Sequence, residues 1–88
     1  MKIKLQFNKQ FEKDLKKLSV KQRSKMGDRL RLFEIDQYNR LLRNHALNGK
    51  YLGYRSINIS GDIRILYKLI DEDTALFVQI GTHSELYG

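Results

Sequence analysis

The chain begins with an alternation of polar and apolar side chains that predicts a half-buried strand over residues 2–7. At Asn8, a residue suited to an N-cap, the spacing changes. Phe11, Leu15 and Leu18 then recur at helical intervals, with mostly charged residues between them. This pattern predicts a first helix with one apolar and one basic face.

A second helix is predicted directly after the first. Ser19 and Gln22 have the spacing of a capping box, and Met26, Leu30 and Phe33 continue as an apolar stripe. Because only one or two residues separate the two helices, we expect them to form an antiparallel hairpin.

After a mixed connection over residues 36–53 the period returns to two. Three further strands are predicted, over residues 54–59, 63–70 and 74–80. The short polar turns between them imply an antiparallel meander. The expected fold is therefore α+β, in the order β-α-α-β-β-β, with the helical hairpin packed on a four-stranded, mainly antiparallel sheet. We expect one domain over residues 1–88, with the second sheet face open to a partner.

Composition narrows the function classes. A chain of 88 residues holds one core but hardly a deep cleft between lobes, which disfavours large cofactor-dependent enzymes. With no cysteine and two histidines, we expect neither a metal site nor a cofactor. The longest apolar run, residues 75–78, is too short for a membrane span, and residues 1–7 lack a secretory apolar region. A cytoplasmic location is expected.

Positive charge is concentrated at the start of the chain. Residues 1–31 carry eleven Lys or Arg and three Asp or Glu, giving +8, whereas residues 32–88 carry six and seven, giving −1. Such a field suits a polyanionic partner, either nucleic acid or an acidic protein segment. Solvated lysine-rich helix faces that keep the protein soluble are the alternative explanation.

Polar groups suited to cleaving RNA lie in the C-terminal half. Attack of a ribose 2′-OH on the adjacent phosphorus needs a base, an acid and cations for the extra phosphorane charge. Imidazole suits both proton roles, and guanidinium suits the phosphate. Considered one at a time, such residues also have ordinary structural roles. A histidine can be a surface residue, Asp62 can be a turn residue of a hairpin, and arginines on strands can face solvent.

Three motifs stand at defined separations: Gly-Tyr-Arg at 53–55, Gly-Asp-x-Arg at 61–64 and Gly-Thr-His-Ser at 81–84. In combination they resemble the toxins of the RelE/ParE superfamily, nearest the YafQ or RelE/StbE branch, and the similarity covers the whole chain. The resemblance implies a type II toxin that cleaves mRNA in the ribosomal A site through 2′-OH attack, without metal. Its implied partners are the ribosome, mRNA and an acidic or amphipathic antitoxin.

The same resemblance implies roles for individual residues. His83 corresponds to the principal catalytic histidine and is expected to be the general acid toward the 5′-oxygen. His45 and Asp62 are expected to act as base or substrate-orienting groups. The remaining implied positions are Arg64 and Tyr87 at the reacting phosphate, and Lys50 and Arg55 as further phosphate contacts.

Three positions depart from the family pattern. Asn58 stands where a second histidine is common, Ile63 replaces an aromatic residue, and Gln79 replaces an arginine. We expect Asn58 and Gln79 to contact RNA, although neither moves a proton near neutral pH nor carries charge. Reduced activity is one consequence. Two alternatives stay open: a ParE-like toxin that inhibits DNA gyrase without nuclease activity, and a degenerate, non-toxic relative that only pairs with an antitoxin.

Overall fold

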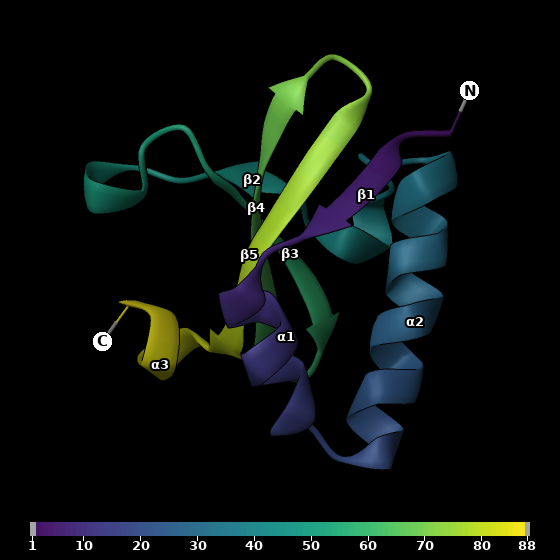
Figure 1. Cartoon of the computed structure of the whole chain (residues 1–88), viewed down its shortest axis with the longest axis vertical. Coiled ribbons are helices and arrows are strands. Elements are labelled where there is room, and N and C mark those ends of the chain that lie inside the picture. Colours follow the sequence, from purple (N-terminus) through teal and green to yellow (C-terminus); the bar gives the residue numbers. More distant parts are fainter. Residues whose placement is uncertain (1, 88) are drawn as a thin grey trace.

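The computed structural model describes residues 2–87. Its strands and helices follow one another in a β-α-α-β-β-β-β-α order with two 3₁₀ turns (Figure 1). The elements are β1 (Lys4–Phe7), α1 (Lys9–Lys16), α2 (Val20–Ile35), η1 (Arg40–Leu42), β2 (His45–Ala46), η2 (Gly49–Tyr51), β3 (Arg55–Ser60), β4 (Ile63–Asp71), β5 (Thr74–Thr82) and α3 (His83–Tyr87). None of the helices in this range is long and apolar enough to cross a membrane.

The strands form one mixed sheet in the order β1-β5-β4-β3-β2. β1 pairs in parallel with β5, and the other neighbours are antiparallel, which confirms the predicted class and meander. The expected four strands are corrected to five. β2 consists of His45 and Ala46, which pair with Ser56 and Arg55 on β3. Two residues are too few to produce a readable alternation.

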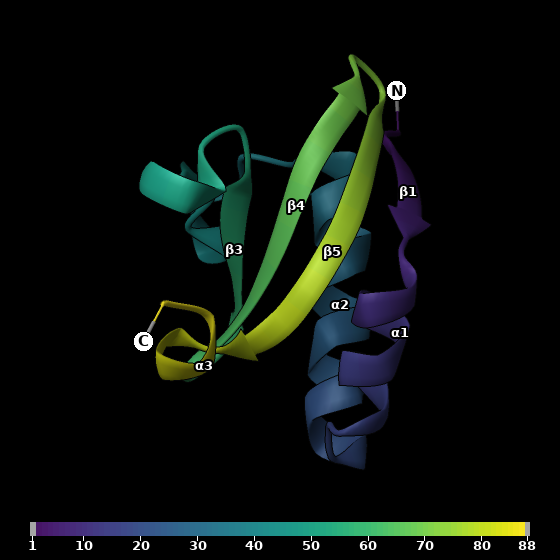
Figure 2. The ribbon, with the colours of Figure 1, turned by 60° about the vertical axis from the view of Figure 1, so that its left-hand side comes forward.

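Both predicted helix starts are confirmed. The Asn8 side chain accepts a hydrogen bond from the backbone N–H of Phe11, and Ser19 and Gln22 form a complete capping box. α1 and α2 cover the same face of the sheet (Figure 2). Between that face and the helices lies the main core, in which Phe33 is fully buried. We call this face of the sheet the helix-covered face.

A bulge in β5 changes which side chains share a face. Tyr67 pairs with Phe77 and Leu66 pairs with Gln79, so one residue of β5 between them is unpaired. The second sheet face is less open than expected, because α3 and η2 lie on that side (Figure 2). Leu66, which alternates with the core residue Tyr67, is fully buried there. We call this side the far face.

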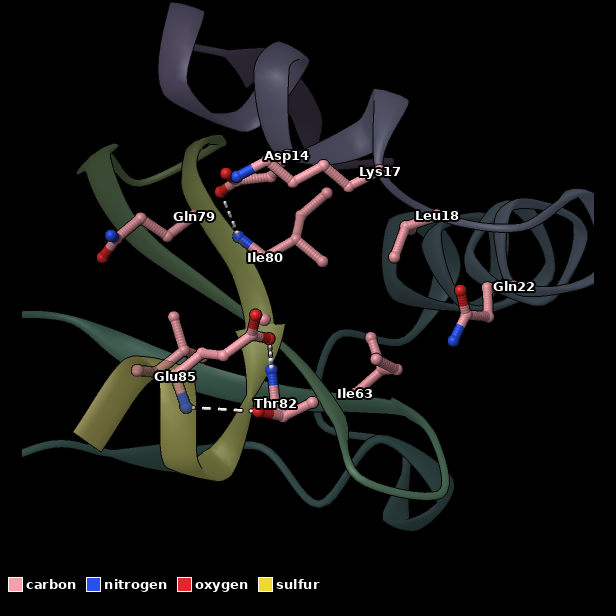
Figure 3. Close-up of a pocket in the computed structure, with 11 residues that line it drawn as sticks. Asp14, Lys17, Leu18, Gln22, Ile63, Gln79, Ile80, Thr82 and Glu85 are labelled. Carbon is pink, nitrogen blue, oxygen red and sulfur yellow. Dashed lines mark hydrogen bonds between the residues drawn. The ribbon is translucent and has the colours of Figure 1, made fainter. Parts of the chain in front are cut away.

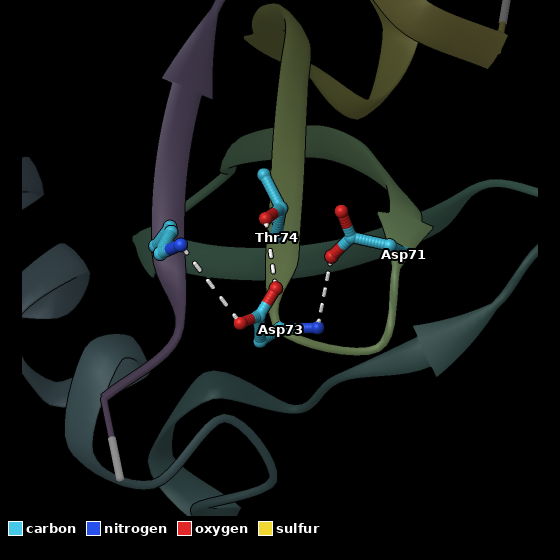
Figure 4. A network of polar contacts seen from close by, with 4 residues as sticks. Asp71, Asp73 and Thr74 are labelled. Carbon is cyan, nitrogen blue, oxygen red and sulfur yellow. Dashed lines mark hydrogen bonds and ion pairs between the residues drawn. The ribbon is translucent and has the colours of Figure 1, made fainter.

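The β4–β5 turn is held by its own acidic residues (Figure 4). The backbone N–H of Asp73 donates to the Asp71 carboxylate at 3.0 Å, and the hydroxyl of Thr74 donates to Asp73 Oδ1 at 3.1 Å. The backbone N–H of Lys4 donates to the Asp73 carbonyl at 2.7 Å. This contact sets the register of β1 against β5, opposite the end of the sheet where α3 begins.

Candidate active site

A cavity of about 430 Å³ on the far face brings together five of the nine predicted site residues. Its lining consists of Arg43, His45, Leu47, Asn58, Arg64, His83 and Tyr87. These residues come from β2, β3, β4, α3 and the segments beside β2. None of the described lining residues is acidic, so the cavity combines two imidazoles with two guanidinium groups in a site that favours an anion.

His83 is the first residue of α3 and is positioned by a capping interaction around it. The backbone N–H of Glu85 donates to the Thr82 hydroxyl at 3.2 Å, and the backbone N–H of Thr82 donates to Glu85 Oε1 at 2.8 Å (Figure 3). The Thr82 backbone hydrogen bond lowers the pKa of the Glu85 carboxyl. This reciprocal pair fixes the direction in which the chain leaves β5, and with it the position of the imidazole.

The strand that leads to His83 is held from the other side by α1. β1 ends opposite Phe77, so it does not pair with β5 at Ile80. The buried carboxylate of Asp14 takes that place and accepts the Ile80 N–H at 2.9 Å (Figure 3). Gln10 donates to the other carboxylate oxygen at 2.8 Å. An acidic side chain thus continues the hydrogen bonding of the sheet edge toward the site.

The orientation of His45 identifies its free nitrogen. Its Nδ1 lies 2.9 Å from the carbonyl oxygen of Arg43. A carbonyl oxygen only accepts, so Nδ1 carries the proton and the neutral ring keeps its lone pair on Nε2. Arg43 has a φ of 48°, in the left-handed region, which turns this carbonyl toward the ring. In this tautomer His45 can accept a proton from a ligand in the cavity.

The remaining polar groups of the cavity come from paired positions and the C-terminus. Asn58 and Arg64 are direct partners across β3 and β4, so both project to the far face. Arg64 Nη1 donates to the Gly61 carbonyl at 3.2 Å. The ring of Tyr87 lies 4.9 Å from the His83 ring, edge to face, and its buried hydroxyl has no hydrogen-bond partner within residues 2–87. That hydroxyl remains able to donate to a phosphate oxygen.

Four predicted positions, Asp62, Lys50, Gln79 and Arg55, lie outside this cavity. Asp62 is exposed in the β3–β4 turn and is not among the lining residues. The ammonium of Lys50 lies 5.3 Å from the centre of the Tyr51 ring on η2. Gln79 lines a separate cavity between α1, β5 and α3, the one drawn in Figure 3.

Arg55 is placed on the opposite face of the sheet. It pairs with Tyr67, its Nε donates to Asn44 Oδ1 at 2.7 Å, and its guanidinium lies 5.3 Å from the centre of the Tyr38 ring. Asn44 Nδ2 in turn donates to the Tyr67 hydroxyl at 2.6 Å. Burial raises the pKa of the Tyr67 phenol. These contacts give Arg55 a structural environment away from the cavity.

Sequence reasoning missed Arg43 and Leu47. Both lie in the connection before β3, which shows no period. A signal for Arg43 was present, since it precedes His45 by two residues and carries a cation; its left-handed backbone was not foreseeable for a non-glycine residue. Leu47 is held by its N–H bond to the Tyr54 carbonyl at 3.0 Å. Within residues 2–87, no three His, Asp or Glu side chains are grouped to hold a metal ion.

Comparisons with known proteins agree with this fold. The family model for the bacterial YafQ toxin of type II toxin-antitoxin systems matches residues 3–88. The mRNA interferase toxin YafQ of Escherichia coli strain K12 is 30% identical over 89 residues, covering 96% of this chain and 95% of that protein. The similarity therefore extends over nearly the whole length of the E. coli protein.

Solved structures give the same result. The crystal structure of YafQ from E. coli strain BL21(DE3) has a TM-score of 0.81 at 23% identity, covering 98% of this chain and 99% of that one, which supports the fold. YafQ in the E. coli DinJ–YafQ complex has a TM-score of 0.72 at 25% identity, covering 98% and 99%. The chain therefore belongs to the YafQ family of toxins of type II toxin-antitoxin systems.

Proposed function

We propose that this toxin is an endoribonuclease that cleaves mRNA on the ribosome through 2′-OH attack. The observation that carries the proposal is that two histidines and two arginines line one cavity together with Tyr87. Support comes from the E. coli relative, which is an mRNA interferase. This relationship favours the nuclease over the gyrase-inhibiting alternative.

The groups at hand fit both proton transfers. His45 Nε2 takes the proton of the 2′-OH as its oxygen forms a bond to phosphorus. Protonated His83 gives its proton to the 5′-oxygen as the P–O5′ bond breaks. The products are a 2′,3′-cyclic phosphate and a free 5′-hydroxyl, with one proton moved from His83 to the leaving group and one gained by His45. Electrons and atoms balance without a further reactant.

The cations and hydrogen-bond donors of the cavity stabilise the transition state. Arg64 and Arg43 face the phosphate whose charge increases during attack. The Tyr87 hydroxyl, buried in the free protein, donates to one of the phosphate oxygens when RNA binding turns the side chain into the cavity. Asn58 orients the substrate but exchanges no proton. Because the cavity is shallow and incomplete, the ribosome supplies the positioning of the codon.

The antitoxin is the second proposed partner. An apolar cavity between the two helices is lined by Phe7, Phe11, Leu15 and Met26 among others, beside the basic residues of α1. An amphipathic segment with acidic flanks would pack there and neutralise this surface. The proposal rests on the family, since E. coli YafQ is seen with DinJ. Affinity for the co-expressed antitoxin should fall as KCl is raised, and an unchanged affinity would exclude the charged contribution.

The nuclease is tested by primer extension on translating ribosomes. His83→Ala should reduce cleavage by about 10²–10⁴-fold, the usual contribution of a general acid. Lys16→Gln, an exposed change on α1, is the control and should cleave as wild type does. Free mRNA without ribosomes should be cleaved far more slowly. Equal cleavage by wild type and His83→Ala, or none by either, would refute the catalytic role.

A further inference from the structure

A second, larger groove of about 600 Å³ adjoins the candidate active site. The two share three lining residues, Arg43, Asn58 and Arg64. Arg29 from α2 and Arg40 from η1 complete a set of four arginines along the groove. None of its described lining residues is acidic. The active-site cavity is lined by two arginines and the apolar cavity between the helices by one, so this groove holds more guanidinium groups than either.

The arginines gather here although the surrounding part of the chain is not basic. Residues 32–88 carry a net charge of −1 and four arginines, and three of these four line the groove. The fourth, Arg55, is engaged by Asn44 on the helix-covered face. Arg29 joins the other three from the basic N-terminal part of the chain, so the positive charge of the groove comes from side chains on separate elements that converge. Each guanidinium group can form two parallel hydrogen bonds with phosphate oxygens. Several of them together suit a ligand with successive phosphates better than a ligand with one charge.

The groove follows an exposed strand edge. β2 pairs with β3 only at Arg55 and Ser56, and no other strand within residues 2–87 pairs with that edge farther along. Arg29 Nε donates to the Ile59 carbonyl at 3.2 Å, so a side chain already occupies this acceptor. An added peptide strand would compete for the same carbonyl. A phosphate chain needs only the outward N–H groups of the guanidinium.

We propose that this groove binds the phosphate backbone of the RNA beyond the scissile step, with Arg29 and Arg40 as its distal contacts. The inference rests on the proposed nuclease function and extends it from one phosphodiester to several nucleotides. Arg43 and Arg64 lie on both surfaces, so they join the cleavage cavity to the groove. Arg29 and Arg40 lie only on the groove and affect RNA binding without taking part in proton transfer.

The test measures binding, using RNA that cannot be cleaved. The probe is a fluorescent single-stranded oligoribonucleotide of about twelve nucleotides with 2′-O-methyl riboses, and its affinity is followed by anisotropy over a KCl series. Each lost phosphate contact should reduce the salt slope of log K by about 0.7, so Arg29→Gln/Arg40→Gln should reduce it by about 1.4. Lys13→Gln/Lys16→Gln removes the same charge from exposed positions on α1 and should keep the wild-type slope.

Two further variants keep the result interpretable if the double variant unfolds. Arg40→Gln alone changes an exposed side chain and should reduce the slope by about 0.7. Arg29→Lys keeps the charge but not the guanidinium fork, and should retain most of the slope. A wild-type slope for Arg40→Gln and for the double variant would overturn the proposal. The proposal would also be overturned if the double variant lost binding to a polyglutamate peptide while its RNA binding stayed unchanged. That result would identify an acidic protein as the occupant.

Failure of the groove and failure of the nuclease give different results. If the groove is misassigned, the slope stays at its wild-type value while cleavage still depends on His83. If the toxin is no nuclease, cleavage is absent with every protein, but the change in slope persists because the probe cannot react. Both readings come from the same purified proteins.

Discussion

The two faces of the sheet are held by different kinds of contact. On the helix-covered face, the rings of Phe33, Tyr67 and Phe77 lie with their centres 4.9–5.3 Å apart and are fully buried. On the far face, both histidines of the cavity sit on short elements, His83 on a five-residue helix and His45 on a two-residue strand. Hydrogen bonds between side chains and backbone hold them there. Stability and chemistry are therefore carried by separate parts of this small protein.

The sharpest test of this separation replaces one large side chain on each face by alanine. Phe33→Ala should destabilise the protein by about 3–5 kcal/mol, because a buried ring is lost and a cavity remains. That is a large part of the ~5–15 kcal/mol typical of a domain. The exposed His83→Ala should change the free energy of unfolding by less than about 0.5 kcal/mol while cleavage is lost. Urea unfolding measures both, and equal losses of stability would contradict the separation.

Asp14 is the residue through which the helix-covered face supports the site. Asp14→Ala leaves the N–H of Ile80 without its acceptor and should cost about 1–3 kcal/mol. Amide exchange at Ile80 should accelerate more than exchange at Phe77, which still lies opposite β1. Glu12→Ala, an exposed change on the same helix, is the control and should stay within about 0.5 kcal/mol of wild type. Unaltered protection at Ile80 would show that this carboxylate does not hold the strand.

The same division explains what the sequence could predict. The spacing of Phe11, Met26 and Phe33 predicts the helix-covered face, because burial along regular elements leaves a period in the sequence. Asn8 and Ser19 predict the helix starts, because capping is a local interaction. The bulge in β5 could not be foreseen, since it depends on how β4 and β5 pair across space.

The site was predictable only as a set of residue types. His45, Arg64 and His83 came from motif resemblance, and the fold brings them to one cavity. Arg55 has the same chemistry and strand context as Arg64, but its register places it opposite Tyr67 on the other face. A shift of one position in a strand reverses the side on which a side chain projects. The alternation in β3 indicates that face, because Arg55 is in step with Ile57 and Ile59, whereas the family resemblance assigned Arg55 to the phosphate.

Glu85 offers a finer test, on the far face itself. Glu85→Ala removes the acceptor of the Thr82 N–H and should lower the cleavage rate severalfold, because the start of α3 loosens around His83. Glu85→Gln keeps an oxygen acceptor and should restore most of the rate. A restored rate would show that Glu85 acts by positioning the start of α3 and not through its negative charge. An equally slow Glu85→Gln would indicate that the carboxylate charge, not the cap, is required.

The pH dependence of that cap follows from its pKa. The folded pKa of Glu85 is lowered, so its stabilising contribution is present above the unfolded value of about 4.3 and is lost as pH falls through the folded value. Thermal unfolding of wild type and Glu85→Gln should therefore converge as the pH is lowered below about 4. A constant difference in melting temperature across that range would contradict the assignment.

The smallest expected effect lies in the polar network of Arg55, Asn44 and Tyr67 on the helix-covered face. Burial raises the pKa of Tyr67, so its folded phenol stays protonated above the unfolded value of about 10. Its contribution to stability is fully present below that pH and is lost as pH rises through the folded value, because the unfolded state ionises first. Tyr67→Phe lacks this titration, although Asn44 keeps its bond to the Gln37 carbonyl at 2.9 Å. The free energies of unfolding of wild type and Tyr67→Phe, measured from neutral pH to above 10, should therefore shift relative to each other only at the alkaline end, to the disadvantage of wild type. A parallel course throughout would mean that the fold does not protect the Tyr67 hydroxyl from ionisation.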